Sequence, residues 1–401
     1  MGDLNNYFEN YLSKEPLFSN KKVLSANYNP NIIPHRGDQI QKLAGILAPA
    51  LREDKPSNVF IYGKTGTGKT LTAKHVTDSM QKIMKKNKVN VIIFYLNCKL
   101  KRVADTEYRL IAEVSRSLGI NVPATGLPTD EVYKMFINSL ENKKVLLLLV
   151  LDEIDQLVSR AGDQILYNLT RLNSELKESQ ISLLGISNDL MFTNYLDPRV
   201  KSSLSEEELV FPPYNAMQLQ SILKERAKDA FRKGVIEQGV LEKCAAYAAR
   251  EHGDARRALE LLRVAGELTE RKNENLITIN ILDEAEEKIE RDRVHDIVTT
   301  QPKQSQLCLL AVLETSKSIG RQPMFTGDLY ELYKDLCFKT KVKPLTQRRI
   351  SDLIAELDML GIINAKVISK GRYGRTRQIS LGIPPSTVPK VEGLLKEVLS
   401  L

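Results

Sequence analysis

Short apolar runs alternate with amphipathic stretches over the first half of the chain. The apolar runs predict strands at about 58–62, 89–97, 145–151, 181–187 and 208–211. Helical spacing predicts helices at about 69–86, 104–118, 129–141 and 162–177, and an earlier one with Ile40, Leu43, Leu47 and Leu51 on one face. This alternation predicts an α/β fold, a parallel doubly wound sheet that binds ligands at the carboxyl ends of its strands.

The strand pattern stops near residue 215. Helical spacing then predicts an all-α block with helices at about 216–232, 238–251, 254–272 and 280–298, the last rich in alternating charge and suited to a connector. After Pro302 we expect helices at about 304–317, 326–339 and 346–360, then two alternating runs at 362–369 and 375–381. A helix-turn-helix followed by a β-hairpin is the order of a winged-helix domain.

The charge of the chain is unevenly distributed. Of 401 residues, 42% are hydrophobic and 27% charged, which is typical of a folded protein, and the net charge is +8. Residues 303–401 hold 16 Lys and Arg against 9 Asp and Glu, so +7 lies there and about +1 in the rest. A basic C-terminal segment favours a polyanionic partner, and a basic surface without function is the alternative.

The sequence also disfavours several classes of protein. No apolar run approaches the roughly 18 residues that span a bilayer, and the N-terminus lacks a signal pattern. We therefore expect a cytoplasmic, nucleoid-associated protein with no membrane partner. The four cysteines are isolated and the four histidines scattered, so neither a zinc site nor a disulfide framework is expected.

A complete G-x-x-x-x-G-K-[ST] loop lies between the first predicted strand and its helix. Its glycines let backbone N–H groups converge on phosphates, at the positive end of the helix that follows. Lys69 would reach the β and γ phosphate oxygens, and the Thr70 hydroxyl would hold Mg²⁺. The predicted cradle for ATP or ADP is Gly63, Lys64, Thr65, Gly66, Thr67, Gly68, Lys69 and Thr70.

Polar side chains end two of the predicted strands. Asp152 and Glu153 follow the fully apolar run 145–151, and Asn188 follows the next strand. Asp152 would anchor the Mg²⁺ shell together with Thr70, and Glu153 would polarise the water that attacks the γ-phosphate. The Asn188 amide could orient that water, although a polar strand end without function is the alternative. Together with the loop, these residues predict an ATPase.

Arg256 lies in the first turn of a predicted helix, where the helix dipole disfavours a cation. A γ-phosphate held between the α/β and all-α blocks would compensate its charge. The angle between the two blocks would then differ between ATP and ADP. An exposed surface arginine is the simple alternative.

The third helix of the winged-helix segment has the character of a recognition helix. Ile350, Leu353, Ile354, Leu357 and Leu360 form its core stripe, and its outward face is short and polar after the expected N-cap. The turn between the last two strands is basic and glycine-rich, which suits phosphate or minor-groove contacts, although such turns also serve solubility. The predicted DNA contacts are Thr346, Gln347, Arg348, Arg349, Lys370, Arg372, Tyr373, Arg375 and Arg377.

The sequence resembles the AAA+ ATPases, and within them the archaeal replication initiators related to origin recognition complex subunit one and the cell-division-cycle-six loader. The resemblance runs from about residue 20 to the C-terminus. Besides the loop and the winged helix, it rests on Pro34-His35-Arg36, Leu151-Asp152-Glu153-Ile154-Asp155, Ser187-Asn188, Asp197-Pro198-Arg199-Val200 and Gly253-Asp254-Ala255-Arg256.

The pattern along the chain predicts four parts: a flexible arm at 1–28, where no clear period is found, a nucleotide-binding base at 29–213, a helical lid at 214–299 and a winged-helix DNA-binding domain at 300–401. The resemblance identifies the base as an AAA+ domain. It implies that His35 and Arg36 border the adenine, that Asn188 is sensor one and that Arg256 is sensor two. It also implies an extra DNA-contacting helical element after Asn97-Cys98. The implied partners are double-stranded origin DNA, the replicative helicase and a paralogous initiator.

One segment departs from the related loaders. They end the stretch at 199–204 with a Ser-Arg pair whose arginine serves a neighbouring active site, whereas Ser202 is followed here by Ser203 and Leu204. Arg199 is the only arginine of this stretch that could serve a neighbouring active site. We therefore predict slow hydrolysis, with ATP acting as a switch. An ATP-gated transcription regulator and a helicase or clamp loader are the alternatives to an initiator.

Overall fold

The computed structural model describes residues 9, 15–26, 28–30, 32–99, 106–123, 126–204, 207–319, 324–369, 375–383 and 387–401. The chain forms two compact units, Met1–Leu282 and Asp283–Leu401. No helix among the described residues is both long and apolar enough to cross a membrane.

The first unit contains a five-stranded sheet in the order β2-β3-β4-β1-β5, with every neighbouring pair parallel. The strands are β1 (Val59–Tyr62), β2 (Val91–Asn97), β3 (Leu146–Asp152), β4 (Gln180–Ser187) and β5 (Glu207–Val210). They match the five predicted strands, and the predicted fold class is confirmed. Since the first half of the chain alternates strands with helices, each crossover returns the chain to the same edge of the sheet, so all carboxyl ends meet there.

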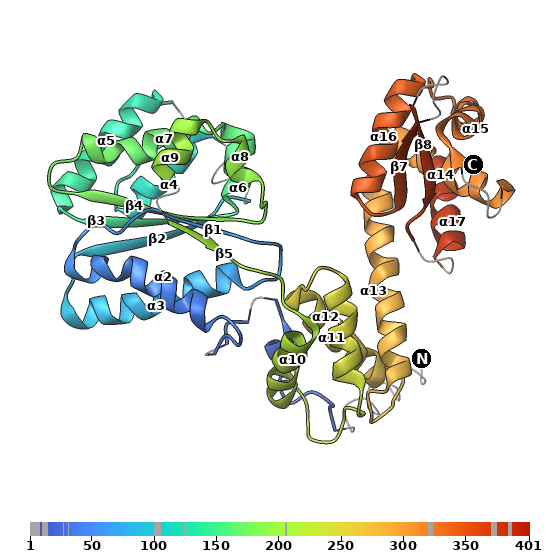
Figure 1. Ribbon diagram of the computed structural model, residues 1–401, viewed down its shortest axis with the longest axis horizontal. Helices are drawn as coiled ribbons and strands as arrows, with labels where there is room; N and C mark the ends of the chain where they lie inside the picture. The colour runs from blue at the N-terminus through green and yellow to red at the C-terminus, as the bar shows by residue number, and fades with distance from the viewer. Residues whose placement is uncertain are drawn as a thin grey trace. The chain divides into compact units, whose positions relative to one another are not determined.

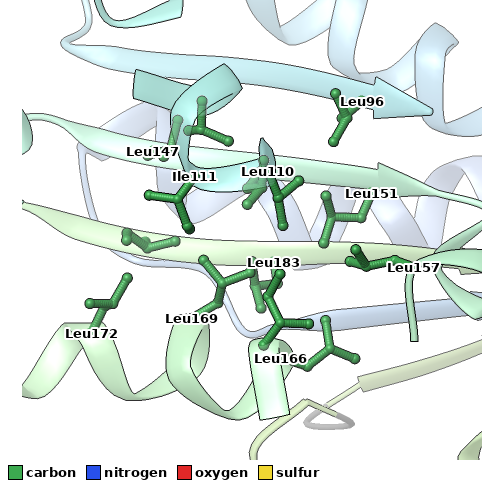
Figure 2. Close-up of a cluster of buried hydrophobic side chains, with 14 of the residues drawn as sticks. Leu96, Leu110, Ile111, Leu147, Leu151, Leu157, Leu166, Leu169, Leu172 and Leu183 are labelled. Carbon is green, nitrogen blue, oxygen red and sulfur yellow. The ribbon is translucent and has the colours of Figure 1, made fainter. Parts of the chain in front are cut away.

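Helices cover both faces of this sheet (Figure 1). On one face lie α2 (Gly37–Leu47) and α3 (Lys69–Asn87), and on the other lie α4 (Glu107–Ser117), α5 (Thr129–Lys143), α6 (Ile154–Ala161), α7 (Gln164–Arg171), α8 (Phe192–Tyr195) and α9 (Pro198–Leu204). Successive residues of β3 point into opposite cores, which explains its unbroken apolar sequence. Leu147 and Leu151 meet Leu110 and Ile111 of α4 in the core that Figure 2 shows.

One helical prediction in this unit was wrong in detail. The helix expected at 162–177 is the shorter α7, followed by a 3-10 turn at Leu172–Ser174. Helix α6, which is equally short, precedes it, and Gly162, with φ +81°, separates the two. This is a backbone conformation that glycine adopts without the strain other residues meet there. The sequence reading also missed α8 and α9.

Three helices and the start of a fourth complete the first unit. They are α10 (Ala216–Ala230), α11 (Val240–Arg250), α12 (Ala255–Arg271) and α13 (Ile279–Thr300). A capping box begins α10, since the Asn215 side chain accepts from the backbone of Gln218 and the Gln218 side chain accepts from that of Asn215. The long helix α13 continues across the boundary at 282–283 into the second unit.

The predicted flexible arm at 1–28 stays a prediction, although its residues 15–26 pack against the helical block formed by α10 to α12. The Phe18 ring stacks on Phe231, with ring centroids 4.6 Å apart. The backbone N–H groups of Ser19 and Asn20 both donate to the carbonyl of Ala230, at 2.8 and 3.1 Å. The hydrophobic period of the sequence could not predict the aromatic stacking or these hydrogen bonds, because the only regular element of residues 15–26 is one 3-10 turn, Lys21–Leu24. We name residues 15–36 the strap, because they run from this block to the start of α2.

The second unit has the expected helix-turn-helix and hairpin. Its helices are α14 (Lys303–Ile319), α15 (Thr326–Lys339), α16 (Gln347–Met359) and α17 (Val388–Leu399), and its three strands are β6 (Met324–Phe325), β7 (Ile363–Ser369) and β8 (Arg375–Leu381), in the order β6-β8-β7. Every residue of 307–313 in α14 is fully buried, so this helix is the centre of the core. The sequence reading missed β6 and α17. The four-part domain division stays a proposal.

Gly266 in the middle of α12 allows the strap to pack closely. A Cβ atom there would lie 2.5 Å from Cζ of Phe18 and 2.8 Å from Cε1 of Phe231. We expect Gly266→Ala to destabilise the strap contact by about 1–3 kcal/mol and to raise deuterium exchange of residues 15–26. Gly45→Ala, in α2 where a Cβ meets no atom within 4 Å, is the control and should stabilise by about 0.5–1 kcal/mol. Equal exchange in both variants would contradict this account.

Candidate functional site

The phosphate loop folds around its own lysine. Lys69 is 5% exposed, and its Nζ donates to the carbonyl oxygens of Gly63 and Lys64, both at 2.7 Å. Burial lowers the Lys69 pKa to about 8, the carboxylate of Asp152 raises it, and the cation of Arg256 lowers it further. Two cations therefore face the same space, which is the electrostatic requirement of a polyanion site.

The acidic strand end lies beside this loop. The Thr70 hydroxyl donates to Oδ2 of Asp152 at 2.9 Å, and the backbone N–H of Glu153 donates to Oδ1 at 3.0 Å. Glu153 has φ +56°, so the chain turns sharply after β3. Its Oε2 is buried without a hydrogen-bond partner among the described residues. An unpartnered buried carboxylate oxygen is costly, which fits a group meant to meet a water or a ligand.

The helical block closes over the loop. The Ala255 N–H, at the start of α12, donates to the carbonyl of Gly66 at 3.3 Å. A Cβ on Gly66 would lie 1.7 Å from Oδ1 of Asp254, so no side chain fits there. The Asp254 carboxylate caps α12 by accepting from the Arg256 and Arg257 N–H groups, at 2.7 and 3.4 Å. This cap supplies part of the compensation that Arg256 needs in a first turn.

A cavity of about 780 Å³ lies between the loop, the strand ends and the helical block. Nine of the predicted residues line it: Gly66, Thr67, Gly68, Lys69, Thr70, Asp152, Glu153, Asn188 and Arg256. Of these, Arg256 comes from the first turn of α12. The structure thus brings together every predicted catalytic residue, although their roles stay predictions. Gly63, Lys64 and Thr65 lie in the loop but not in the lining of this cavity.

His35 and Arg36 also lie outside that lining. His35 is exposed, with φ +60°. Arg36 is 2% exposed, and its guanidinium donates to the carbonyl of Thr67 at 2.8 Å and to that of Pro212 at 2.5 Å. It also lies 3.9 Å from the Tyr214 ring centroid. Arg36 therefore ties the phosphate loop to the segment that leads into α10, and its predicted place beside adenine stays a prediction.

Sequence reasoning missed the opposite end of the cavity. The strap lines it with Tyr28, Ile32 and Ile33, and α10 contributes Ile222 and Arg226. The Arg226 guanidinium lies 4.7 Å from the Tyr28 ring centroid and donates to the carbonyl of Val23 at 3.4 Å. These apolar and aromatic groups form a surface suited to a planar heterocycle. No spacing motif marks them, because they come from an irregular segment and a different helix.

The predicted recognition helix is α16. Thr346 is its N-cap, accepting from the Arg349 N–H at 3.4 Å, which confirms the predicted cap. Gln347, Arg348 and Arg349 are exposed, and Arg349 pairs with Asp352 at 3.5 Å. The expected core stripe is buried at Ile350, Leu353, Ile354 and Leu357, with Leu360 partly buried. These exposed donors lie at the start of the helix, where a major-groove contact requires them.

The predicted hairpin contacts are only partly described. Lys370, Arg372 and Tyr373 lie outside the described residues, and Arg375 begins β8. Arg377 donates from Nε to the Ser351 hydroxyl at 3.1 Å, so it joins the hairpin to α16. Its contact with the helix was not foreseen.

The side chains of the cavity fit a magnesium nucleotide. The Thr70 hydroxyl and the Asp152 carboxylate supply the oxygen ligands that Mg²⁺ prefers. Lys69 and Arg256 supply the cations that triphosphate oxygens require, and Glu153, whose Oε2 has no partner among the described residues, lines the same cavity. Glycine at position 66 leaves the loop open to phosphate.

Three family models match successive parts of the chain. They are the AAA domain over residues 52–190, the Cdc6 AAA+ ATPase-type lid domain over 220–287, and the CDC6 C-terminal winged helix domain over 296–391. Together with the parallel sheet and the cavity beneath the helical block, they define the class as an AAA+ ATPase with a lid and a winged-helix domain. Helices α10 to α12 are thus the lid.

Relatives cover nearly the whole chain. The ORC1-type DNA replication protein of Thermococcus onnurineus is 52% identical over 392 residues, covering 97% of this chain and 94% of the relative. ORC1-type DNA replication protein 1 of Archaeoglobus fulgidus is 52% identical over 377 residues, covering 94% of this chain and 90% of the relative. The structure of the Aeropyrum pernix ORC1 protein in complex with DNA matches with a TM-score of 0.82 and 44% identity. The match covers 96% of this chain and 98% of that protein. The chain belongs to the ORC1-type DNA replication initiators, as its resemblance predicted.

The lowered pKa of Lys69 predicts a pH dependence of nucleotide binding. The ammonium is charged below pH 8 and loses its proton above it, so the phosphates must restore that proton on binding at higher pH. We expect affinity for ADP to fall up to about tenfold per pH unit above pH 8, with net proton uptake. Calorimetry in buffers of different ionisation enthalpy measures both. Lys69→Met should bind weakly without this slope, and a flat wild-type profile from pH 7 to 9.5 would contradict the account.

Proposed function

We propose that this protein is an ATP-dependent replication initiator that binds duplex origin DNA and helps to recruit the replicative helicase. The observation that carries the proposal is the cavity in which the phosphate loop, the acidic strand end and the lid arginine Arg256 meet. A site shared by base and lid changes with the nucleotide, so it can couple ATP to DNA binding. Membership of the ORC1-type family supports the DNA-binding part.

In the proposed site each residue has one task. Lys69 binds the β and γ phosphate oxygens, and the loop N–H groups bind the remaining ones. Thr70 and Asp152 hold Mg²⁺, which when bound neutralises phosphate charge. Glu153 accepts a proton from the attacking water, Asn188 orients that water, and Arg256 binds the γ-phosphate from the lid. The apolar end formed by the strap and α10 accommodates the adenine.

We propose that hydrolysis is slow, so that ATP acts as a switch. The segment at 199–204 lacks the Ser-Arg pair of related loaders, and Arg199 is its remaining candidate for such an arginine. Arg199 already donates to both carboxylate oxygens of Asp197 at 3.1 Å, in an exposed ion pair within its own chain. This arrangement favours a switch over a loader that turns over rapidly in a ring.

We propose two DNA contacts. The N-terminal turn of α16 would enter the major groove through Gln347, Arg348 and Arg349, while the hairpin follows the backbone. The helical element around α4 would add a second contact from the base. The Aeropyrum pernix relative was solved in complex with DNA, which supports DNA as the partner. Helicase and paralogue binding rest on the family alone.

Origin binding separates this proposal from an ATP-gated transcription regulator. We would recover genomic fragments bound by the full chain and by Arg348→Ala/Arg349→Ala, then test helicase capture on the bound DNA. Fragments near a replication start that share a repeat, lost in the variant, with ATP-dependent helicase capture, support an initiator. Promoter-spread fragments without helicase capture would favour the regulator.

Glu153→Gln should separate ATP binding from hydrolysis. The amide keeps the size of the side chain but cannot accept the proton, so we expect single-turnover hydrolysis to fall by roughly 100-fold or more with ATP affinity preserved. Glu131→Gln, on the exposed face of α5, is the control and should hydrolyse as the wild type does. Wild-type hydrolysis in Glu153→Gln would remove this residue from the mechanism.

Arg348→Ala/Arg349→Ala should weaken DNA binding and lower its salt dependence. Each lost phosphate contact should reduce the slope of log affinity against log salt by about 0.9, and a lost base contact should cost about 1–3 kcal/mol of discrimination. Lys303→Ala/Lys390→Ala removes the same charge from exposed sites on α14 and α17 and should leave sequence discrimination unchanged. Equal losses in both variants would show a nonspecific charge effect, contrary to the proposal.

A further inference from the structure

Tyr95 lies on the strand next to the acidic strand end. In the register of β2 and β3, Tyr95 pairs with Val150 and Asn97 with Asp152. Side chains two residues apart on a strand share a face, and both Tyr95 and Asn97 line the cavity. Tyr95 therefore lines the cavity from the same face of the sheet as Asp152, on the strand next to β3.

That hydroxyl donates to Oδ2 of Asp152. The same oxygen accepts from the Thr70 hydroxyl at 2.9 Å, while Oδ1 accepts from the Glu153 N–H at 3.0 Å. Asp152 is only 3% exposed, so its carboxylate is fixed by donors from β2, α3 and its own turn. A buried carboxylate held by three donors has little freedom to rotate.

The tyrosine ring is itself held in place. The Lys74 ammonium, from the second turn of α3, lies 4.6 Å from the ring centroid and lines the same cavity. This cation–π contact joins the ring to the helix that carries Thr70. Tyr95 thus spans the gap between β2 and the two residues proposed to hold the metal, and it occupies a position that a phenylalanine could fill without reaching Asp152.

We propose that Tyr95 is a positioning residue that aims the Asp152 carboxylate at the bound Mg²⁺. It touches neither nucleotide nor metal in this assignment and acts through the orientation of Asp152. Partners that orient a metal ligand in this way typically contribute 10–100-fold to metal affinity. The inference rests on the proposed nucleotide function and assigns a residue outside the phosphate loop and the acidic motif.

The test is Tyr95→Phe in the full chain, with fluorescent ADP titrated in EDTA and then with increasing Mg²⁺. We expect ADP affinity in EDTA to stay within about twofold of the wild type, while the Mg²⁺ concentration for half-maximal tightening rises about 10-fold or more. When Mn²⁺ replaces Mg²⁺ in the nucleotide complex, its electron paramagnetic resonance lines should broaden in the variant, because the Asp152 carboxylate would no longer hold one orientation. If the substitution only disturbed the fold of the site, ADP binding would weaken as much in EDTA as it does in Mg²⁺.

Tyr62→Phe is the matched control. Tyr62 lies on β1 of the same sheet, and its hydroxyl donates to Glu208 at 2.7 Å, away from the cavity lining. This variant should keep the wild-type Mg²⁺ dependence. An unchanged Mg²⁺ dependence in Tyr95→Phe, or an equal loss of affinity in EDTA, would overturn the inference.

A double-mutant cycle tests the route through Asp152. If Tyr95 acts by orienting that carboxylate, Tyr95→Phe should add little to the Mg²⁺ defect of Asp152→Asn. Additive defects would overturn the inference, because they would give Tyr95 a separate role. Failure of the wild type to bind ADP at all would instead refute the proposed nucleotide function, so the two failures are distinguishable.

Discussion

The close approach of the lid to the phosphate loop is the constraint on which the site depends. Gly66 faces Asp254, and a Cβ on Gly253 would lie 2.4 Å from the carbonyl oxygen of Tyr214. Both glycines have positive φ, at +68° and +71°. Any side chain at either position would push the first turn of α12 away, and Arg256 with it. The glycines are therefore as necessary to the lid as they are to phosphate binding.

The buried polar groups around the cavity extend this constraint. Arg36 donates hydrogen bonds to the carbonyl oxygens of Thr67 and Pro212. The Asp152 carboxylate accepts hydrogen bonds from Thr70, Tyr95 and Glu153. Apart from the bond between the neighbours Glu153 and Asp152, each bond joins two distant chain segments, so the loop, the acidic strand end and the lid linker form one connected network. Removing one partner would leave a buried donor or acceptor unpaired, which costs about 1–3 kcal/mol.

The parts that could be predicted from sequence are those with a period or a motif. Five apolar runs gave the five strands, and the loop at 63–70 together with Asp152 located the cavity. The strap could not be predicted, because its hold on the lid comes from single residues such as Phe18 and from backbone bonds. Tyr95 was likewise hidden, since its meaning depends on the register of β2 against β3. Helix α17 was missed after Pro384 and Pro385, which obscured the short amphipathic pattern that follows.

The strap gives the lid a second attachment to the base. One is the linker that leads through Pro212 and Tyr214 into α10, and the other is the strap, bonded to Ala230 at one end and continuous with α2 at the other. A body tethered at one point can swivel in any direction, whereas a body tethered at two points turns mainly about the line that joins them. Motion of this lid is therefore reduced towards a single angle of opening. Two values of this single angle are enough to distinguish two nucleotide states for the rest of the chain.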